Sequence, residues 1–310
     1  MNKFPLVIEA SSHRDSLLSL DPGPIIDEYK NHGALLFKKF LWDTAEFAEF
    51  TKMFCTHSAY NESPGRLMIE PVNSIQTVNL GSEKFPFHPE LSRTPWRPDV
   101  CFFACKTPAQ KGGETFISDG CRIVEAMPVH LSTELSTRKL RFRQSVKLKE
   151  ARFWLSHPNP GPQELASPPE QCPYTFELID GRPEKIFDRP FLNRAMFSDE
   201  LAFANFTLFA RLFHRNYTSP TFDDGGQIGD ELVSQLDRLT NRFKEAVRWE
   251  HGDVLMLDNS RFMHAREELP DTRNRQILTY FGYLKFAIPP HYEGKNPRWR
   301  IPGEMSSLFH

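Results

Sequence analysis

Segments with the character of β-strands lie in the first and the last third of this chain, and a long stretch without that character separates them. In the first third they cover about 33–40, 74–81, 99–108 and 109–120. In the last third they cover 245–266 and 275–286. Strands this far apart in sequence must close one sheet system if their apolar side chains are to be buried together. We therefore expect a mainly β protein, a sandwich or jelly-roll barrel with flanking helices outside.

The middle of the chain is less regular. Residues 157–173, HPNPGPQELASPPEQCP, are rich in proline and predict a loop. Apolar residues at helical spacing predict helices over 198–217 and 227–244, and the same signal predicts helices over 22–32, 43–54 and 119–135. We expect residues 1–310 to form a single domain with a helical and loop insertion at about 140–245, which is where a mobile lid over a site would lie.

Charge and cysteine content narrow the class of protein. The 310 residues carry a net charge of −2, so no broad basic surface for nucleic acid is expected. No apolar run approaches the ~20 residues that span a bilayer, so no membrane partner is expected and the cytoplasm is the default location. The five cysteines have no regular spacing. Cys101 and Cys105 share one face of a strand, which favours buried reduced thiols over a disulfide.

The tripeptide His-x-Asp/Glu, which can supply two metal ligands, occurs four times. It begins at His13, His88, His251 and His291. Random placement of 11 His and 40 acidic residues over 310 positions gives roughly 1.4 such tripeptides, so the pattern alone is weak evidence. The copy at His251 has a simpler explanation, because its Asp253 is placed to fix a turn. The copy at His291 lies in a Pro-rich tail, PPHYEGKNP.

An arginine near the C-terminal end of the chain gives a reason to prefer His88. His264 and Arg275 lie on two strand segments joined by a short polar turn, which suggests the two arms of a hairpin. Alternation places Arg275, Ile277, Thr279 and Phe281 on one face of the second segment. If that face looks into the core, the charge of Arg275 is costly unless it meets an anion. A dicarboxylate cosubstrate would supply one in bidentate geometry.

The residues at 88 and 90 have a spacing that suits a metal ion. Side chains two apart on a strand share a face, so His88 and Glu90 can both point at one ion, with a third ligand from another strand. Two histidines and one carboxylate leave open positions, an arrangement suited to ferrous iron that must bind an oxo acid and dioxygen together.

Five short motifs follow one another along the chain. They are His88-x-Glu90, the turn Gly112-Gly113-Glu114-Thr115, the segment from Gly252-Asp253 to Asp258-Asn259, His264, and Arg275 eleven residues later. In this order they resemble the TauD/TfdA-like family of Fe(II)- and 2-oxoglutarate-dependent dioxygenases, in the clavaminate-synthase-like group. The resemblance spans about 33–286 and is weakest over 140–225. It implies a double-stranded β-helix core, that is, a cupin-like jelly roll.

The resemblance also implies roles. His88, Glu90 and His264 resemble the iron ligands and hence the catalytic centre of the family. Arg275 resembles the residue that holds the distal carboxylate of 2-oxoglutarate, and Thr115 its helper. The cofactors implied are Fe(II), 2-oxoglutarate and O₂, and the implied reaction converts 2-oxoglutarate to succinate and CO₂ while a substrate C–H bond is oxidised.

Two departures from taurine dioxygenase bear on the substrate. Glu90 stands where taurine dioxygenase has Asp, and Glu occurs in the amino-acid hydroxylase branch of the family. Thr279 stands where taurine dioxygenase has a second, substrate-binding arginine. These departures favour hydroxylation of an unactivated sp³ carbon in an amino acid or an amino-acid-derived metabolite, free or held on a carrier protein in natural-product biosynthesis. Desaturation and cyclisation use the same chemistry and stay open.

Four further residues are candidates for substrate contact. Arg266, Gln76 and Asn79 lie near the predicted ligands, and Thr279 occupies the position of the missing arginine. Arg266 shares a face with His264, so it could bind a cosubstrate or substrate carboxylate, or pair outside with Glu267 or Glu268.

Two other classes of protein stay open. A non-catalytic jelly-roll binding protein would retain only a vestigial metal site. A zinc hydrolase could use the same three ligands, but it leaves Arg275 and the Gly-Gly-Glu-Thr turn unexplained. The sequence predicts no oligomeric state.

Overall fold

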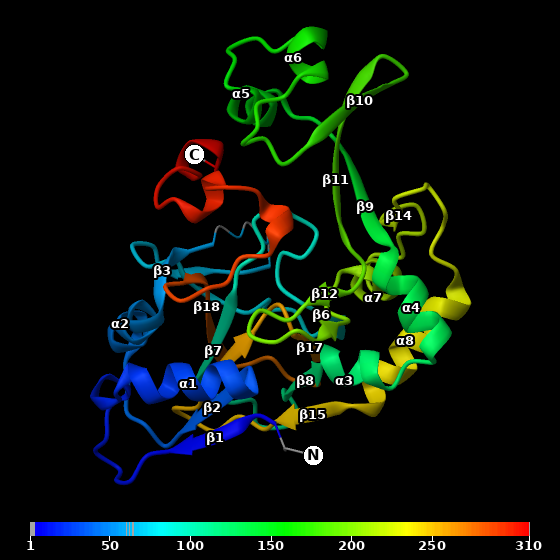
Figure 1. Ribbon diagram of the computed structural model, residues 1–310. Helices are drawn as coiled ribbons and strands as arrows, with labels where there is room; N and C mark the ends of the chain where they lie inside the picture. The colour runs from blue at the N-terminus through cyan, green and yellow to red at the C-terminus, as the bar shows by residue number, and fades with distance from the viewer. Residues whose placement is uncertain (1–3, 60, 62, 64, 310) are drawn as a thin grey trace.

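Two β-sheets form the centre of the protein in the computed structural model, which describes residues 4–59, 61, 63 and 65–309 (Figure 1). The larger sheet has the strand order β1 (Leu6–Glu9), β2 (Ala34–Lys38), β16 (Val254–Asp258), β7 (Val100–Thr107), β18 (Gln276–Leu284), β5 (Ile75–Thr77) and β4 (Met68–Glu70), with β3 (Cys55–Ser58) also paired to β18. The smaller sheet has the order β15 (Lys244–Val247), β8 (Thr115–Asp119), β17 (Phe262–Arg266) and β6 (Phe85–His88). The expectation of a mainly β protein with helices is confirmed.

The chain passes repeatedly from one sheet to the other. It runs from β6 to β7 to β8, and later from β15 through β16 and β17 to β18, changing sheet at each step. The predicted hairpin of His264 and Arg275 is therefore wrong. Both edges of β17 are already paired, with β6 and with β8, so the strand after Arg275 cannot pair with it and joins the larger sheet beside β7.

The central strands of the larger sheet, β2, β16, β7 and β18, are buried on both faces, which explains the nearly continuous apolar runs in their sequences. Phe103, Leu255 and Ile277 face the smaller sheet, and their neighbours in the chain face the helices. Ile277 and Phe281 of β18 point into the space between the sheets, so the predicted alternation along this strand is confirmed. Cys101 and Cys105 also lie in that space as free, buried thiols, as expected.

Helices α1 (Pro22–His32) and α2 (Thr44–Phe54) cover the outer face of the larger sheet. Both match the predicted ranges, and the short helix η1 (Leu17–Ser19) precedes them. Asp43 caps α2 by accepting from the backbone N–H of Glu46, whose side chain accepts from the N–H of Asp43 in return. The rings of Phe47, Phe50 and Phe54 are buried against the sheet. One helical face thus supplies the second layer of the core.

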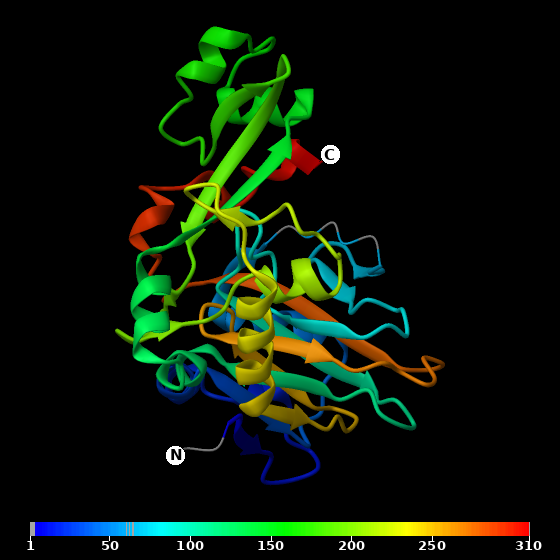
Figure 2. The same cartoon turned by 90° about the vertical axis from the view of Figure 1, so that its right-hand side faces the viewer.

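The region 139–190, here called the arm, projects from the sandwich (Figures 1 and 2). It contains the strands β9 (Lys139–Ser145), β10 (Thr175–Ile179) and β11 (Arg182–Pro190) with the helices α5 (Leu148–Leu155) and α6 (Pro162–Ala166), and β14 (Thr221–Phe222) pairs with β9. The expectation of helix and loop is wrong for β9, β10 and β11, although two helices lie between β9 and β10. In β9 (KLRFRQS) and β11 (RPEKIFDRP) nearly every second residue is charged. These strands therefore lack the apolar signal by which the sandwich strands were predicted.

The predicted helix over 198–217 is also wrong in extent. Only α7 (Thr207–Leu212) is helical, and β12 (Asn193–Arg194) pairs with β13 (Leu201–Ala202) before it. Phe203 donates to the backbone carbonyl of Gly120, which holds the preceding segment extended. The side chain of Asn205 accepts from the N–H of Thr207 and starts the helix there.

Three of the remaining helices lie close to their predicted places: α3 (Gly120–Glu125), α4 (Val129–Thr137) and α8 (Asp230–Arg242). The short helices η2 (His291–Glu293), η3 (Arg298–Arg300) and α9 (Ser306–Phe309) lie in the C-terminal segment, where the sequence predicts no helix. Pro128 separates α3 from α4, which together occupy the helical segment predicted over 119–135. In the part of the chain that the structure describes, no helix combines the length and apolar character needed to cross a membrane.

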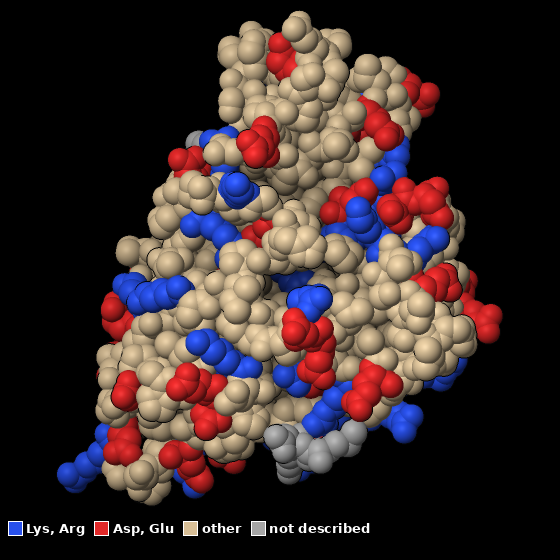
Figure 3. Space-filling model, in the orientation of Figure 1, with Lys and Arg blue, Asp and Glu red and all other residues tan. Residues whose placement is uncertain are grey.

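Aromatic side chains hold the arm against the rest of the molecule. Trp154 stacks on Trp96 with ring centroids 6.1 Å apart and meets Trp299 edge-on at 6.3 Å. Arg298 lies over the ring of Phe153 at 3.7 Å and donates to its backbone carbonyl. Figure 3 shows that acidic and basic side chains are interspersed on the visible face, and that few of them lie on the upper lobe formed by the arm.

Candidate metal centre

His88, Glu90 and His264 lie together at one end of the smaller sheet. His264 in β17 is the register partner of His88 at the end of β6, and their ring centroids are 4.5 Å apart. The Glu90 Oε1 atom is 3.4 Å from His264 Nε2. One ligand atom from each residue can be chosen so that all three lie within 4.8 Å of one another. Among the described residues this is the one group of three or more His, Cys, Asp or Glu with such spacing.

Backbone contacts orient the members of this group. His88 Nδ1 lies 2.8 Å from the carbonyl of Pro86, which leaves its Nε2 directed away from the strand. The Asn259 side chain accepts from the Glu90 N–H at 2.8 Å and donates to the Glu90 carbonyl at 3.0 Å. Asn259 also donates to the Pro98 carbonyl, so one amide fixes both ends of the loop that carries Glu90. The Asp-Asn motif quoted from the sequence thus acts on the candidate ligand loop from the neighbouring sheet.

The surroundings favour the protonation states that bind a metal. Burial and, to a smaller extent, the nearby His264 ring lower the pKa of His88 to about 3, so His88 is neutral at ordinary pH. Burial alone would raise the pKa of Glu90, but the Arg66 guanidinium and His264 hold it well below its usual range. A neutral imidazole beside a carboxylate is the form in which both donate electron pairs to a cation.

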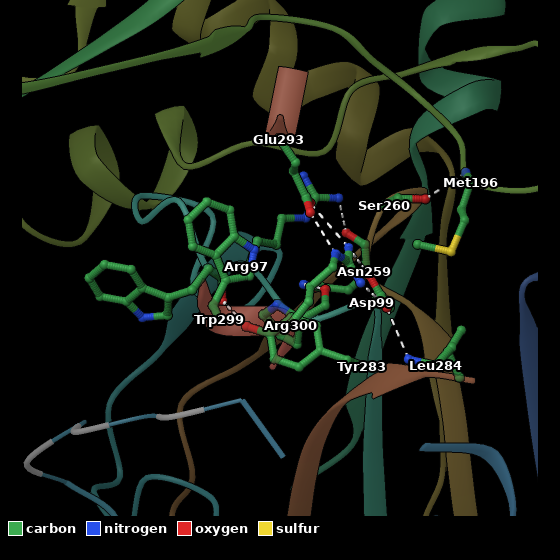
Figure 4. A network of polar contacts seen from close by, with 12 residues as sticks. Arg97, Asp99, Met196, Asn259, Ser260, Tyr283, Leu284, Glu293, Trp299 and Arg300 are labelled. Carbon is green, nitrogen blue, oxygen red and sulfur yellow. Dashed lines mark hydrogen bonds and ion pairs between the residues drawn. The ribbon is translucent and has the colours of Figure 1, made fainter. Parts of the chain in front are cut away.

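Two of the three competing tripeptides have other partners. Asp253 pairs with Lys38 at 3.0 Å and accepts from the Glu250 N–H, so the interpretation of a fixed turn is confirmed. Glu293 pairs with Arg300 at 2.6 Å. Arg300 also forms two hydrogen bonds with Asp99, at 2.8 and 2.9 Å, and Asp99 accepts from the Leu284 N–H (Figure 4). This network anchors the C-terminal segment beside the start of β7.

The same close-up shows a second clamp on the loop that follows Glu90. Arg97 is buried and donates to the Asn259 backbone carbonyl (Figure 4). It also donates to the carbonyl of Ala204. The amide of Asn193 reaches the same Ala204 carbonyl. Residues from the insertion are thereby tied to the loop of the candidate ligands.

Arg66 is a member of the site that sequence reasoning missed. Its Nη2 donates to Glu90 Oε1 at 2.6 Å, and its Nη1 donates to the Thr279 hydroxyl at 3.1 Å. The side chain is 7% exposed, lies 4.8 Å from the ring centroid of Phe281, and its Nε atom has no hydrogen-bond partner among the described residues. Arg66 precedes β4 in a stretch with no motif, so the sequence contains no signal that places it here.

A small cavity of about 50 Å³, here called the inner cavity, lies next to the three candidate ligands. Arg275 and Thr115 both line it, as expected. Arg275 donates to the Gly113 carbonyl at 3.3 Å, forms no ion pair with a carboxylate of the described residues, and leaves its Nε without a partner. Burial lowers its pKa. The Thr115 hydroxyl accepts from Trp249 Nε1 at 3.0 Å, so its proton is available for a further acceptor.

Gly113 makes the approach of Arg275 feasible. Its φ is +81°, and a Cβ there would lie 2.8 Å from the Cβ of Ala109 and 3.2 Å from Arg275 Nε. The second glycine of the Gly-Gly-Glu-Thr turn therefore provides both a left-handed conformation and room for the guanidinium.

Arg266 lines the inner cavity, and its contacts test one of the three roles considered for it, an ion pair on the outside of the protein with Glu267 or Glu268. Its guanidinium donates to the backbone carbonyls of Asn79, Gly81 and Glu83 at 2.8, 2.5 and 2.8 Å. Burial, with the nearby Arg275, lowers its pKa to about 10. The external ion pair is wrong, because Glu267 pairs with Lys84 and Arg266 is buried.

The other three candidates for substrate contact differ in position. Asn79 lines the inner cavity and also the larger outer cavity described below. Gln76 donates to the Asn61 carbonyl and lines neither. Thr279 is buried, accepts from Arg66 and donates to the Gln76 carbonyl. Thr279 therefore reaches the site only through Arg66.

A larger outer cavity of about 620 Å³ opens on the other side of His88 and Glu90. Aromatic side chains form much of its wall: Phe85, Trp96, Phe206, Phe209 and Phe213. The ring of Phe209, in α7, lies 4.3 Å from the His88 ring. The insertion therefore contributes one wall of this cavity, whereas its role as a mobile lid stays a prediction.

The donor set and its surroundings fit a non-haem iron and a dicarboxylate. Two imidazoles and one carboxylate form the ligand set that such iron uses. The Nε atoms of Arg275 and Arg266 and the Nδ1 of His264 are buried and have no partner among the described residues, so a bound anion or water would satisfy them.

The chain is similar to known proteins along most of its length. The family model described as taurine catabolism dioxygenase TauD, TfdA family matches residues 15–280. No curated protein sequence matches the chain significantly.

Solved structures share the fold at low sequence identity. A taurine dioxygenase from Burkholderia xenovorans is 12% identical, with 92% of this chain and 89% of that chain covered and a TM-score of 0.61. The PvcB protein from Pseudomonas aeruginosa is 14% identical, with 89% and 84% covered and a TM-score of 0.58. A second structure of PvcB, described as an Fe, alpha-ketoglutarate dependent oxygenase from an isonitrile synthetic pathway, is 14% identical, with 89% and 85% covered and a TM-score of 0.56. The match to the family model over most of the chain confirms the resemblance drawn from the motifs: the chain belongs to the TauD/TfdA family and is a dioxygenase.

Proposed function

We propose that this dioxygenase uses Fe(II) and 2-oxoglutarate to hydroxylate an unactivated sp³ C–H bond of an amino acid or an amino-acid-derived metabolite. The observation that carries the proposal is the adjacency of two features. The His88, Glu90 and His264 side chains converge, and a cavity beside them is lined by an arginine without a carboxylate partner. A structural arginine is satisfied by an acidic partner or by several carbonyls, as Arg266 is, whereas Arg275 has one hydrogen bond of 3.3 Å to a described residue and can bind an anion.

His88 Nε2, His264 Nε2 and a Glu90 carboxylate oxygen would hold the iron. Arg275 would bind the distal carboxylate of 2-oxoglutarate, and the Thr115 hydroxyl would donate to the same group. Bound Fe(II) supplies the redox chemistry that couples oxidation of 2-oxoglutarate to oxidation of the substrate, with succinate and CO₂ as coproducts.

The chain itself contributes position and shielding. The Asn259 amide fixes the backbone of Glu90, and Pro86 fixes the His88 ring. The rings that line the outer cavity give the site an apolar wall on that side. The site opens toward the outer cavity, where a substrate has room to bind.

Three finer features belong to the same proposal. The two sheets between which the chain alternates would form the core of a double-stranded β-helix. The substrate would be a metabolite, free or tethered to a carrier protein, in a natural-product pathway, and the description of PvcB as an enzyme of an isonitrile synthetic pathway supports this class. Five free cysteines favour a reducing compartment such as the cytoplasm.

The alternative reactions differ in how they account for Arg275. A zinc hydrolase or a vestigial binding protein would use the three candidate ligands or none of them. Neither explains why Arg275, beside these ligands, has one hydrogen bond among the described residues and no carboxylate partner there. Desaturation and cyclisation remain alternatives within the same reaction class, because they need the same iron and cosubstrate.

The test is made without oxygen. Fe(II) and then 2-oxoglutarate are added to the purified apoprotein, and the visible charge-transfer band of the chelated cosubstrate is titrated. We expect a band in the wild type and at least a tenfold higher requirement for 2-oxoglutarate in Arg275→Ala, since a charge-assisted pair is lost. Absence of the band in wild-type protein that demonstrably holds iron would reject the cosubstrate.

A further inference from the structure

We propose that the outer cavity selects a substrate with an aromatic body and a carboxylate, and that Arg66 is the residue that anchors the carboxylate. This inference rests on the proposed function, because it concerns the same site with iron and 2-oxoglutarate in place. Thr279 of β18 stands where taurine dioxygenase has a substrate-binding arginine, and its hydroxyl carries no charge to pair with an anion. The inference assigns that contact to Arg66, which lies in a loop.

The position of Arg66 is the first argument. Arg66 lines both the inner and the outer cavity, so its guanidinium stands at the boundary between the cosubstrate and the substrate side. Arg66 donates one of its five N–H groups to Glu90 and one to Thr279, and its buried Nε–H has no partner among the described residues. A guanidinium that lines both cavities, and whose donors are not all used by described residues, can bind an anion there.

The balance of buried charge is the second argument. Without metal, Glu90 neutralises Arg66. Bound Fe(II) adds two positive charges, 2-oxoglutarate removes two, and Arg275 adds one, so the loaded centre keeps one positive charge in excess. Arg266, which meets backbone carbonyls only, adds a second. An uncompensated charge in a partly buried site is costly, and a monoanionic substrate would remove part of that cost.

The lining of the outer cavity supplies the rest of the specificity. Phe213 stacks on Phe85 with ring centroids 4.9 Å apart and lies 4.8 Å from Phe209. These rings form a wall beside His88, so a flat apolar body would lie against them close to the metal. Glu83, the other carboxylate that lines the cavity, is exposed and therefore opposes an anion only weakly.

Arg93 is the competing anchor, since it is the other arginine among the described residues that line the outer cavity. It is exposed and lies over the ring of Phe206 at 5.6 Å. An ion pair at such a position is screened by water and contributes little. The buried Arg66 is therefore the stronger site.

The experiment measures binding, not turnover. Wild-type protein loaded with Fe(II) and 2-oxoglutarate under anaerobic conditions is titrated by calorimetry with 3-phenylpropanoate, with its neutral amide 3-phenylpropanamide, and with propanoate. We expect the phenylpropanoate to bind at least about tenfold more tightly than either of the others, as one charge-assisted pair and one buried ring would give. Equal binding of acid and amide overturns the anionic site, and equal binding of the two acids overturns the aromatic one.

Variants then locate the anchor. In Arg66→Gln the preference for acid over amide is expected to fall below about threefold, whereas Arg93→Gln keeps it. A preference that survives in Arg66→Gln, or that disappears in Arg93→Gln, overturns the assignment. If Arg66→Gln no longer binds iron, Arg66→Lys is titrated in its place. Lysine lacks the bidentate fork, so the ratio of acid to amide affinity should fall to about half of the wild-type ratio. An undiminished preference in that variant overturns the proposal.

Two controls separate this inference from the proposed function. The charge-transfer band is recorded before each titration. Its absence in the wild type rejects the proposed function, while a normal band without preference for the acid rejects the anchor alone. In metal-free protein Glu90 neutralises Arg66, so the preference should also fall below about threefold, and an unchanged preference there contradicts the charge argument.

Discussion

Strands β16 and β17 of the sandwich are buried at every residue, whereas β10 of the arm has no fully buried residue. The two regions bury apolar side chains in different ways. The sandwich packs both faces of the larger sheet, while the arm docks mainly through Trp154 and its neighbours. The candidate metal centre lies in the sandwich, where close packing fixes side chains on either side of the inner cavity. The arm contacts the loop that follows Glu90, because Trp154 stacks on Trp96 and Arg189 donates to the Ser92 backbone carbonyl.

From this comparison we expect substitutions near the metal centre in the sandwich to change iron binding and turnover. We expect substitutions in the arm to change mainly the stability of the protein. The largest effect is expected for His264→Ala, which removes a candidate ligand. Succinate formation should fall below about 1% of the wild-type rate, and no charge-transfer band should form, since two ligands hold iron poorly. His251→Ala is the matched control, because His251 is exposed and contacts only the Lys106 carbonyl among its described partners. Full activity in His264→Ala would show that the ligand assignment is wrong.

Asn259→Ala tests whether the sandwich positions the ligand loop across sheets. Loss of the amide frees the Glu90 backbone and leaves buried polar groups unpaired, so iron affinity should fall by about 10- to 100-fold and stability by about 1–3 kcal/mol. Iron titration and thermal unfolding measure the two. Asn241→Ala, in which the lost bonds lie within α8, is the control for stability. Wild-type iron affinity in Asn259→Ala would mean that the loop holds its shape without the clamp.

Two neighbouring glycines allow a smaller and sharper test. Gly113→Ala and Gly112→Ala both introduce strain of about 1 kcal/mol at a positive φ. Only the added methyl at 113 meets Arg275, while that at 112 lies 3.8 Å or more from its nearest neighbours. The half-saturating concentration of 2-oxoglutarate should rise about tenfold in Gly113→Ala, in line with a misplaced charge-assisted contact, and little in Gly112→Ala. Equal effects would show that strain, and not crowding of Arg275, is responsible.

The smallest effect on the metal centre is expected for Trp154→Ala in the arm. Removing the indole should weaken docking of the arm by about 3 kcal/mol and expose the arm to limited proteolysis. Iron affinity should stay within about threefold of the wild type, because no described contact joins Trp154 to the three candidate ligands. A tenfold loss of iron affinity would contradict the claim that substitutions in the arm change mainly stability. It would show that the stack of Trp154 on Trp96 supports the ligand loop.

The fold was predictable in proportion to how deeply each strand is buried. Apolar runs identified β7, β16 and β18, and a capped Phe-rich face identified α2. The arm strands were missed because charged residues pair across them, as Arg141 does with Asp188 at 2.7 Å, so their pattern resembles that of a polar loop. The hairpin expected for His264 and Arg275 failed because alternation specifies the face of a strand but not its neighbour.

The sequence by itself determined the family, the three candidate ligands and the inward face of Arg275, because motif order and strand period are properties of the linear chain. Only the tertiary structure revealed that Arg66 pairs with Glu90 and that Arg266 binds backbone carbonyls. It also revealed that Asn259 holds a loop 169 positions away. Such contacts join segments whose separation is set by how loops close and sheets pack, and no local pattern records which side chains then meet.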